Sequence, residues 1–433
     1  MADRSGATAL QPQLSYHHGR EATEFSRIRS LAAERFATME WPKTSEEEWR
    51  RSDVSSFNFD RYEVSLNGQE SPSATALPDG ASAFFRFAAD GNRLSAMSDT
   101  ARDAGLVIST LDALQSSDRL TADVAALMEH LVQDGADNRF VAWNAAAFTE
   151  GIVVSVPEGY TAAEPVIVEY EIGGDGVAVL PRTIVRAASG SDASVIVRLR
   201  GTEEEGEAFV CEVHQMDVAT NARLRYSMVN ELNIDSTLIS LGSGTVARDG
   251  FLRHSATHLG GLFTKGRIDV ALRGPGADME LDGLYFTHAD QHMDLRTVQR
   301  HEAPTAYSRT FYKGALRDEG RSVYQGLIRV EENASGTDAY LTNNNLVLND
   351  GARSDSIPSL QIGTNDVRCS HGSTTGRIDP VQLFYLMSRG YSESEAVEML
   401  IEGFFDEIVA KLPEILQDEL RQTIAQRVRE AGA

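Results

Sequence analysis

The sequence predicts a mainly β protein, a β-solenoid with helical regions at both ends. From Gly151 to about Cys369 the chain consists of short β-like runs interrupted by turns, and no long helical pattern breaks the series. In the second half of this stretch turn residues recur every 14 to 16 residues or so, a spacing roughly that expected for one coil of a solenoid. Amphipathic helical patterns precede and follow the β-rich part.

The spacing of the turns separates a solenoid from other all-β folds. A sandwich or a barrel places its turns about every 8 to 12 residues, so the longer spacing favours the solenoid and leaves the other two as alternatives. The turn signals are Gly274-Pro275-Gly276, Asp290, Pro304, Asp318-Glu319-Gly320, Ser335-Gly336, Asp350-Gly351 and Asn365-Asp366.

The N-terminal part carries two amphipathic helical patterns, at 23–39 and 120–132. Between them, Ser45 and Glu48 have the spacing of a capping box and predict a short helical start. Residues 65–82 are rich in Ser, Gly, Pro and Asn and read as a linker. We therefore expect a mostly helical N-terminal region.

The C-terminal part returns to helix. Asp379 as N-cap and Pro380 at the first helical position begin a helix that Gly390 ends. Ser392 and Glu395 form a second capping box. A last helical pattern follows Pro413 and closes a division into domains at 1–139, 140–376 and 377–433. These helices carry more apolar surface than a solenoid cap needs, and either a partner protein or their mutual packing can use it.

Composition excludes several classes of function. A net charge of −24 argues against binding to nucleic acid or to an anionic membrane. No apolar run approaches the roughly 20 residues that cross a bilayer, and residues 1–19 lack an apolar signal core, so we expect a cytoplasmic protein. Phosphate-binding glycine loops, H-E-x-x-H, C-x-x-C and G-x-S-x-G are all absent, which weighs against a self-contained enzyme.

Cys369 and His371 are the candidate metal ligands. In an extended segment they point to the same face, and both are good ligands for iron, copper or zinc. Two ligands do not complete a site, so a second subunit would have to supply the rest; the alternative is structural packing at the end of a sheet. Cys211, the other cysteine, alternates with apolar residues and is expected to be a buried structural thiol. The β context argues against a helical zinc pair at His254 and His258.

Several segments together resemble the SufB/SufD family of iron–sulfur cluster assembly proteins, in particular its SufD branch. The resemblance covers most of the chain, is strongest from about 140 to 412, and is most specific at Asn365-Asp366-Val367-Arg368-Cys369-Ser370-His371-Gly372. The other matching segments include Asp290-Gln291-His292-Met293-Asp294, Tyr312-Lys313-Gly314, Tyr324-Gln325-Gly326, Thr342-Asn343-Asn344-Asn345-Leu346, Leu383-Phe384-Tyr385-Leu386 and Ser388-Arg389-Gly390.

The resemblance implies a right-handed parallel β-helix that works as a non-catalytic scaffold subunit. It implies a SufB-like paralogue as partner along the solenoid, and a SufC-like ATPase that docks at about 380–412 and hydrolyses ATP for the complex. The docking residues would be Leu383, Phe384, Tyr385, Arg389 and Gly390. Iron or a nascent cluster would be held transiently by His371 and Cys369, with no stably bound cofactor. Cys211 matches no sulfur-accepting motif of the SufB branch.

The residues are also compatible with two other functions. The chain could be a SufB-type core scaffold that acts as a homodimer. A β-solenoid could also be a carbohydrate-active enzyme, for which Asp278, Glu280 and Asp282 alternate onto one face, although a solvated acidic face is the simpler interpretation.

Overall fold

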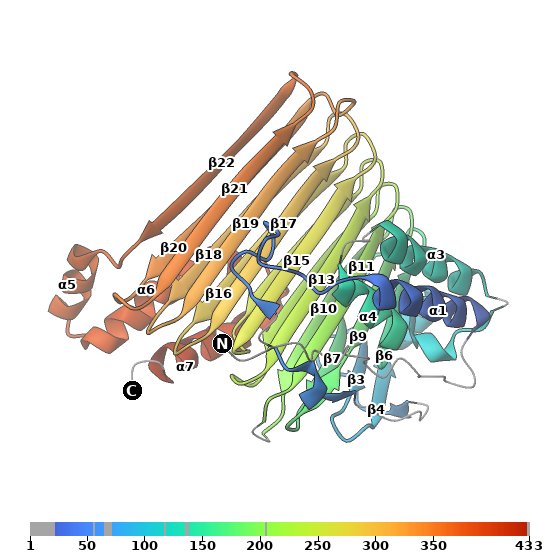
Figure 1. Cartoon of the computed structure of the whole chain (residues 1–433), viewed down its shortest axis with the longest axis horizontal. Coiled ribbons are helices and arrows are strands. Elements are labelled where there is room, and N and C mark those ends of the chain that lie inside the picture. Colours follow the sequence, from blue (N-terminus) through green and yellow to red (C-terminus); the bar gives the residue numbers. More distant parts are fainter. Residues whose placement is uncertain are drawn as a thin grey trace, which may run out of the picture.

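The β-rich stretch forms two long sheets that face each other and share their coils (Figure 1). This computed structural model describes residues 22–54, 57–64, 72–116, 118–134, 138–203 and 206–430. From β6 onward, successive strands alternate between the sheets with few exceptions, and the chain advances one coil for each pair of strands. The predicted mainly β solenoid with helices at both ends is therefore confirmed, and the sandwich and barrel alternatives are wrong.

We name the two sheets A and B. Sheet A contains, in spatial order, β21 (Arg353–Ile362), β19 (Arg321–Val330), β17 (His292–His301), β15 (Phe263–Leu272), β13 (Thr237–Val246), β11 (Phe209–Val218), β9 (Pro181–Ala187), β6 (Glu150–Val156) and β5 (Val107–Thr110), with β8 (Val177–Val179) and β1 (Glu63–Val64) at its side. Sheet B contains β2 (Ser73–Ala74), β4 (Arg93–Met97), β3 (Ala83–Phe87), β7 (Val166–Ile172), β10 (Asp192–Gly201), β12 (Arg223–Glu231), β14 (Phe251–His258), β16 (Asp278–Thr287), β18 (Tyr307–Leu316), β20 (Thr337–Val347) and β22 (Val367–Gly376).

The strands of the solenoid pair in parallel, each with the strand one coil away. Asp278 of β16 pairs with Tyr307 of β18, while β17 between them belongs to the other sheet. The turn spacing seen in the sequence therefore corresponds to the length of one strand with its turn. The prediction that it corresponds to a whole coil was wrong. A coil contains two such units because a two-sheet solenoid turns twice per coil.

Alternate side chains point into the space between the sheets and form the main core. Val154, Val195 and Leu252 are completely buried there. At the N-terminal end, α2 (Asp99–Asp103) and β3 close the interior with Ala101 and Phe87, both buried. Burial of these apolar faces is the main source of stability in such a fold.

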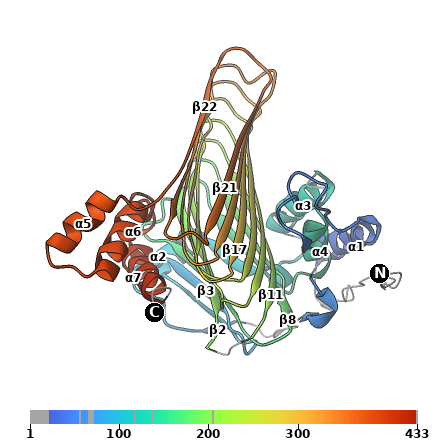
Figure 2. The same ribbon diagram turned by 60° about the vertical axis from the view of Figure 1, so that its left-hand side comes forward.

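Helices pack against part of the outer face of each sheet (Figure 2). The helices are α1 (Thr23–Thr38), α2, α3 (Arg119–Asp134), α4 (Arg139–Ala147), α5 (Pro380–Ser388), α6 (Glu393–Val409) and α7 (Glu414–Glu430), with short 3-10 turns η2 (Phe59–Arg61) and η3 (Leu111–Ala113). Helices α1, α3 and α4 pack on sheet A, where Phe36, Phe140 and Phe209 share one cluster. Helices α6 and α7 pack on sheet B through residues such as Phe405 and Leu420.

The predicted C-terminal caps are confirmed. The Asp379 carboxylate accepts a hydrogen bond from the Val381 N–H, and Pro380 is the first residue of α5. Ser392 and Glu395 form the complete capping box of α6. The positive φ of +102° at Gly390 ends α5, a backbone conformation that glycine adopts without strain.

The predicted capping box at Ser45 and Glu48 is wrong. Residues 44–51 form turns, and the Glu48 carboxylate instead pairs with Arg267 of β15, at 2.8 Å. The tertiary ion pair replaces the local bond because β15 runs directly beneath this segment. Of the predicted linker, residues 65–71 lie outside the described part, and Ser73–Ala74 form the short strand β2.

Candidate functional site

The last strand, β22, places Cys369 and His371 on the same face, as the sequence predicts. In the parallel register they lie beside Ala339 and Leu341 of β20. Both of those residues are buried in the core between the sheets, so Cys369 and His371 face the interior of the solenoid at its final coil. Figure 1 shows β22 as the last of the described strands at this end of its sheet.

Cys369 is half-buried against the core, whereas His371 is exposed. Burial raises the pKa of the Cys369 thiol, and the nearby Asp338 carboxylate adds to the shift, although a backbone hydrogen bond at Ala339 opposes it. The thiol is therefore favoured over the thiolate at neutral pH. A metal ion would have to displace this proton, because the thiolate is the ligand form.

The interior of the last coil is not covered. Leu360 and Ile362 of β21 lie beside Ile328 and Val330, which are buried, yet they are 36% and 40% exposed themselves. Strands β21 and β22 also end the two sheets, so each has one edge without a neighbouring strand. Exposed apolar interior and open strand edges are features that soluble proteins normally cover. The end that holds Cys369 and His371 thus has the character of an interface.

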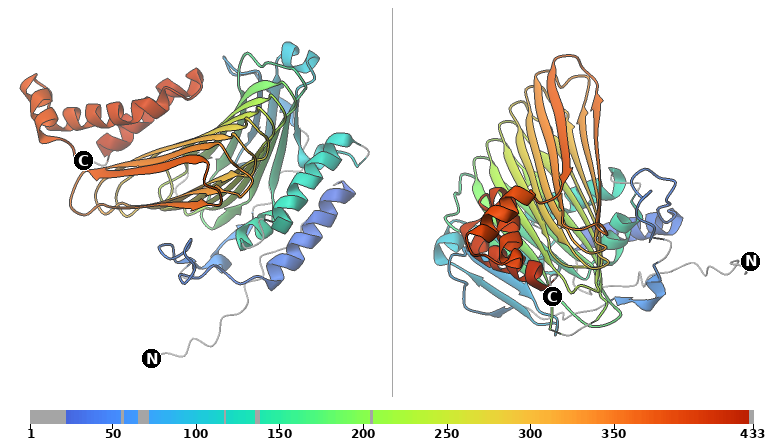
Figure 3. Two further views of the ribbon diagram at one scale, coloured as in Figure 1. Left: turned by 90° about the horizontal axis from the view of Figure 1, so that it is seen from above. Right: turned by 90° about the vertical axis from the view of Figure 1, so that its left-hand side faces the viewer.

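A second uncovered surface lies on α5, which stands apart from the sheets (Figure 3). The predicted docking residues Leu383, Phe384, Tyr385, Arg389 and Gly390 lie on this helix or at its end. None of the residues of α5 is buried, and Val381, Phe384 and Tyr385 are 71%, 72% and 55% exposed. An apolar helix without a buried face resembles one half of a helix-in-groove contact.

The described residues contain no group of three or more His, Cys, Asp and Glu side chains arranged to hold a metal ion. Cys369 and His371 supply two donors of the kind that iron accepts, a sulfur and an imidazole nitrogen. A complete coordination shell at this end therefore requires ligands from outside the described part of the chain.

Cys211 occupies a different environment. It lies on the outer face of β11 beneath α4, completely buried, and its Sγ donates to the Phe140 carbonyl at 3.5 Å. Burial raises the pKa of this thiol far above its ordinary value, with the Glu212 carboxylate as the second cause. The prediction that Cys211 is a buried structural thiol agrees with this environment.

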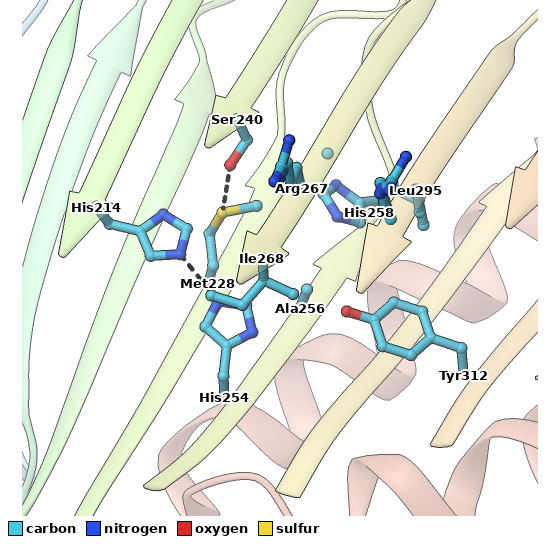
Figure 4. Close-up of a pocket in the computed structure, with 12 residues that line it drawn as sticks. His214, Met228, Ser240, His254, Ala256, His258, Arg267, Ile268, Leu295 and Tyr312 are labelled. Atoms are coloured by element: carbon cyan, nitrogen blue, oxygen red, sulfur yellow. Dashed lines mark hydrogen bonds between the residues drawn. The ribbon is translucent and has the colours of Figure 1, made fainter. Parts of the chain in front are cut away.

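Inside the solenoid, a chain of polar groups lies among the apolar residues, and the sequence pattern did not reveal it. Figure 4 shows three of its members, Ser240, His214 and His254. Ser240 donates to the Glu212 carboxylate at 2.7 Å, and His214 Nδ1 lies 3.0 Å from the same carboxylate. His214 Nε2 lies 3.0 Å from His254 Nε2, with the two rings 8° from parallel, so one of these nitrogens donates a hydrogen bond to the other. Alternation along β11 places Glu212 and His214 on one face, but His254 comes from the opposite sheet, which sequence alone does not show.

A cavity of about 20 Å³ adjoins this chain, enough space for a water molecule. His254 and His258 of β14 both line it, and the Nδ1 atom of each has no partner. Burial lowers the pKa of His258 to about 4 and that of His254 well below its usual value, the latter also because of His214. The interior histidines of β14 are therefore neutral at physiological pH.

The acidic residues of β16 do not form a solvated face. Asp282 is 1% exposed and accepts from Lys411 at 2.9 Å, and Glu280 accepts from Arg253 at 2.8 Å. The simple interpretation was wrong for Asp282, because the C-terminal helices cover this part of sheet B. The ion pairs of Glu280 and Asp282 weigh against a carbohydrate-active site on β16.

Comparison with known proteins identifies the family. The family model described as “SUF system FeS cluster assembly, SufBD core domain” matches residues 170–404. The chain belongs to the SufBD family. The matched segment begins in β7 and ends in α6, so it includes the whole run of long strands, the Cys369 and His371 end, and α5.

Curated SufBD relatives extend over similar parts of the chain. An iron–sulfur cluster assembly SufBD family protein of Mycobacterium leprae is 34% identical over 285 residues, covering 64% of this chain and 71% of the relative. One from Mycobacterium tuberculosis is 35% identical over 290 residues, with the same coverage. The iron–sulfur cluster assembly protein SufD of Escherichia coli is 29% identical over 398 residues, 89% of this chain and 88% of the relative. In the described residues no helix is both long and apolar enough to span a bilayer.

Proposed function

We propose that this SufBD chain is a SufD-like, non-catalytic scaffold subunit, cytoplasmic, which supports iron acquisition and cluster assembly at an interface with a SufB-like paralogue. The observation that carries the proposal is the uncovered final coil, where Cys369 and His371 face an interior that Leu360 and Ile362 leave exposed. The likeness to the Escherichia coli SufD over most of both chains supports the branch.

A partner of the same fold would cover this end most directly. Its own last coil would meet Leu360 and Ile362, and its edge strands would continue sheets A and B beyond β21 and β22. Ligands from the partner would then lie beside His371 and Cys369 and complete a shell for iron or a nascent cluster, the cargo of the reaction. His371 is the stronger candidate ligand because it is exposed and, unlike Cys369, has no thiol proton that the metal must displace.

A SufC-like ATPase would dock on α5. The exposed Phe384 and Tyr385 would provide the apolar contact, and Arg389, which lies 5.0 Å from the Tyr385 ring, would provide a charged rim. ATP hydrolysis by the docked subunit would move α5 and, through it, α6, which packs on the outer face of sheet B, so the movement would reach the strands.

The test is anaerobic reconstitution of the chain with its SufB-like and ATPase partners. We expect His371→Ala to reduce the iron and sulfide content of the assembled complex roughly tenfold, a loss of one charged or metal-bonded contact. Ser373→Ala is the matched control, since Ser373 is exposed two residues further along the same face of β22. Normal cluster content in the His371→Ala complex would remove the ligand role.

Assembly itself is tested separately by size-exclusion chromatography. Leu360→Asp with Ile362→Asp is expected to abolish association with the SufB-like chain, because two carboxylates would be placed in the apolar contact. The same pair leaves α5 unchanged, so binding of the ATPase should persist. A chain that stays monomeric with both partners would contradict the scaffold function.

The SufB-type alternative, a homodimer, uses the same uncovered coil. A two-fold contact between two copies would place two Cys369 and two His371 side chains at one interface. It is distinguished by adding the paralogue: a heterodimer that displaces the homodimer supports the SufD-like role.

A further inference from the structure

A groove on the outer face of sheet A is lined by several arginines, in a chain whose net charge is −24. It has a volume of about 690 Å³ and lies where the N-terminal segment and α3 approach the strands (Figure 1). Three carboxylates line it, those of Glu46, Glu48 and Asp269. We call it the arginine groove after the five arginines that line it, Arg267, Arg273, Arg296, Arg300 and Arg329.

The arginines lie side by side because of the strand register. Arg267 is the neighbour of Arg296 on the next strand, and Arg300 is the neighbour of Arg329. Ile268 points into the core, so Arg267 points outward into the groove. Like charges on adjacent strands, about 4.8 Å apart, destabilise a sheet. Two such pairs on one face therefore need anionic groups beside them to be stable.

Each of the five arginines has a carboxylate partner, Glu302 and Glu331 among them, but among the described residues most of the guanidinium N–H donors stay unused. Glu48 accepts from Arg267 at 2.8 Å and lies 3.5 Å from Arg296, and Asp269 accepts from Arg300 at 2.7 Å. A guanidinium has five N–H donors, and the described contacts use one or two on each of the five arginines. The side chain of Arg296 is 20% exposed, and its buried Nε has no partner at all.

We propose that the arginine groove binds a small polyanion, a metabolite that carries at least two phosphate or carboxylate groups. Its volume lies within the range of about 300 to 1,000 Å³ that small-molecule sites occupy. Arg296 and Arg300 are four residues apart on β17, about 13 Å along the strand, so one anionic group can meet each arginine pair. Guanidinium groups bind phosphate and carboxylate in the same bidentate manner. This site is on the opposite side of the solenoid wall from the interior residues and does not depend on the proposed function.

Isothermal titration of the full-length chain with two probes whose anionic groups stand well apart, fructose 1,6-bisphosphate and sebacate, tests the proposal at constant ionic strength. Saturable binding of either probe is expected, and the stronger one identifies the phosphate or the carboxylate class. Arg296→Ala with Arg300→Ala should weaken that binding roughly tenfold or more. Asp269→Asn should tighten it several-fold, because it removes a fixed anion that occupies Arg300.

Two controls make the outcome decisive. Arg309→Ala removes a half-exposed arginine on sheet B that pairs with Asp338, and it should leave binding unchanged. The Arg296→Lys and Arg300→Lys pair keeps the charge and should bind better than the alanine pair, which shows that the loss is not a folding defect. The proposal fails if neither probe gives saturable heat, if the alanine pair binds like the wild type, or if Asp269→Asn weakens binding.

Discussion

The space between the two sheets is closed at one end of the solenoid and open at the other. At the N-terminal end, α2 and β3 insert Ala101 and Phe87, which are 0% and 4% exposed, and close the space between the sheets. At the C-terminal end the equivalent space opens at Leu360 and Ile362, which are about one third or more exposed. Because a single chain builds both ends by the same strand register, the difference reflects what each end must contact. The closed end supports the fold, and the open end leaves an apolar surface on which the proposed partner would lie.

The largest effect is expected from placing a carboxylate in the closed part. Val168 of β7 is completely buried in the main core, so Val168→Asp should cost about 4 kcal/mol or more of unfolding free energy. Leu360→Asp places the same group in the open coil, where water reaches it, and should cost less than about 1 kcal/mol. Urea denaturation followed by circular dichroism measures both. Equal losses would mean that the last coil is packed as closely as the first.

A second contrast compares two phenylalanines of the C-terminal helices. Phe405 of α6 is completely buried against sheet B, and Phe405→Ala should cost about 3 to 5 kcal/mol. Phe384 of α5 is 72% exposed, and Phe384→Ala should change the free energy of unfolding of the isolated chain by less than about 0.5 kcal/mol. The same variant should weaken binding to the ATPase partner. A large stability loss from Phe384→Ala would show that α5 is covered within the chain itself.

Local sequence signals predicted the helical end of the molecule well. Asp379 and Pro380 at α5, and Ser392 with Glu395 at α6, act within one turn, so no distant contact changes the outcome. The signal at Ser45 and Glu48 failed because Arg267, far along the chain, competes for the carboxylate. A charged side chain that finds a partner on a strand does not cap its own helix.

The site was predictable only where it depends on alternation along one strand. That rule placed Cys369 and His371 on one face, and the structure keeps them there. It did not show that this face is the open interior, because the coil length was taken as one strand instead of two. The contact of His214 with His254 joins opposite sheets and depends on how the coils stack. Alternation along a single strand does not show how the coils stack.

The enclosed part should also respond to acid. Burial lowers the pKa of His258 to about 4. Between pH 6.5 and 4, His258 is therefore mostly protonated in the unfolded chain and mostly neutral in the folded chain. Stability therefore falls as the pH falls through this window, by about 2 kcal/mol at pH 5 from this residue. His258→Gln should remove that part of the loss, as seen in urea midpoints measured from pH 7 to 5. Parallel curves for the two proteins would contradict the linkage.

The smallest effect compares the same kind of cap on a covered and an uncovered helix. Ser392 and Glu395 cap α6, which packs on sheet B, so Ser392→Ala should cost about 1 kcal/mol of global stability. Asp379 caps α5, which has nine residues and no buried side chain. An isolated helix of that length is marginal in water, so Asp379→Ala should unravel α5 while the urea midpoint stays within error. Amide hydrogen exchange would then rise in α5 alone, whereas a cost near that of Ser392→Ala would mean that α5 contributes to the fold before any partner binds.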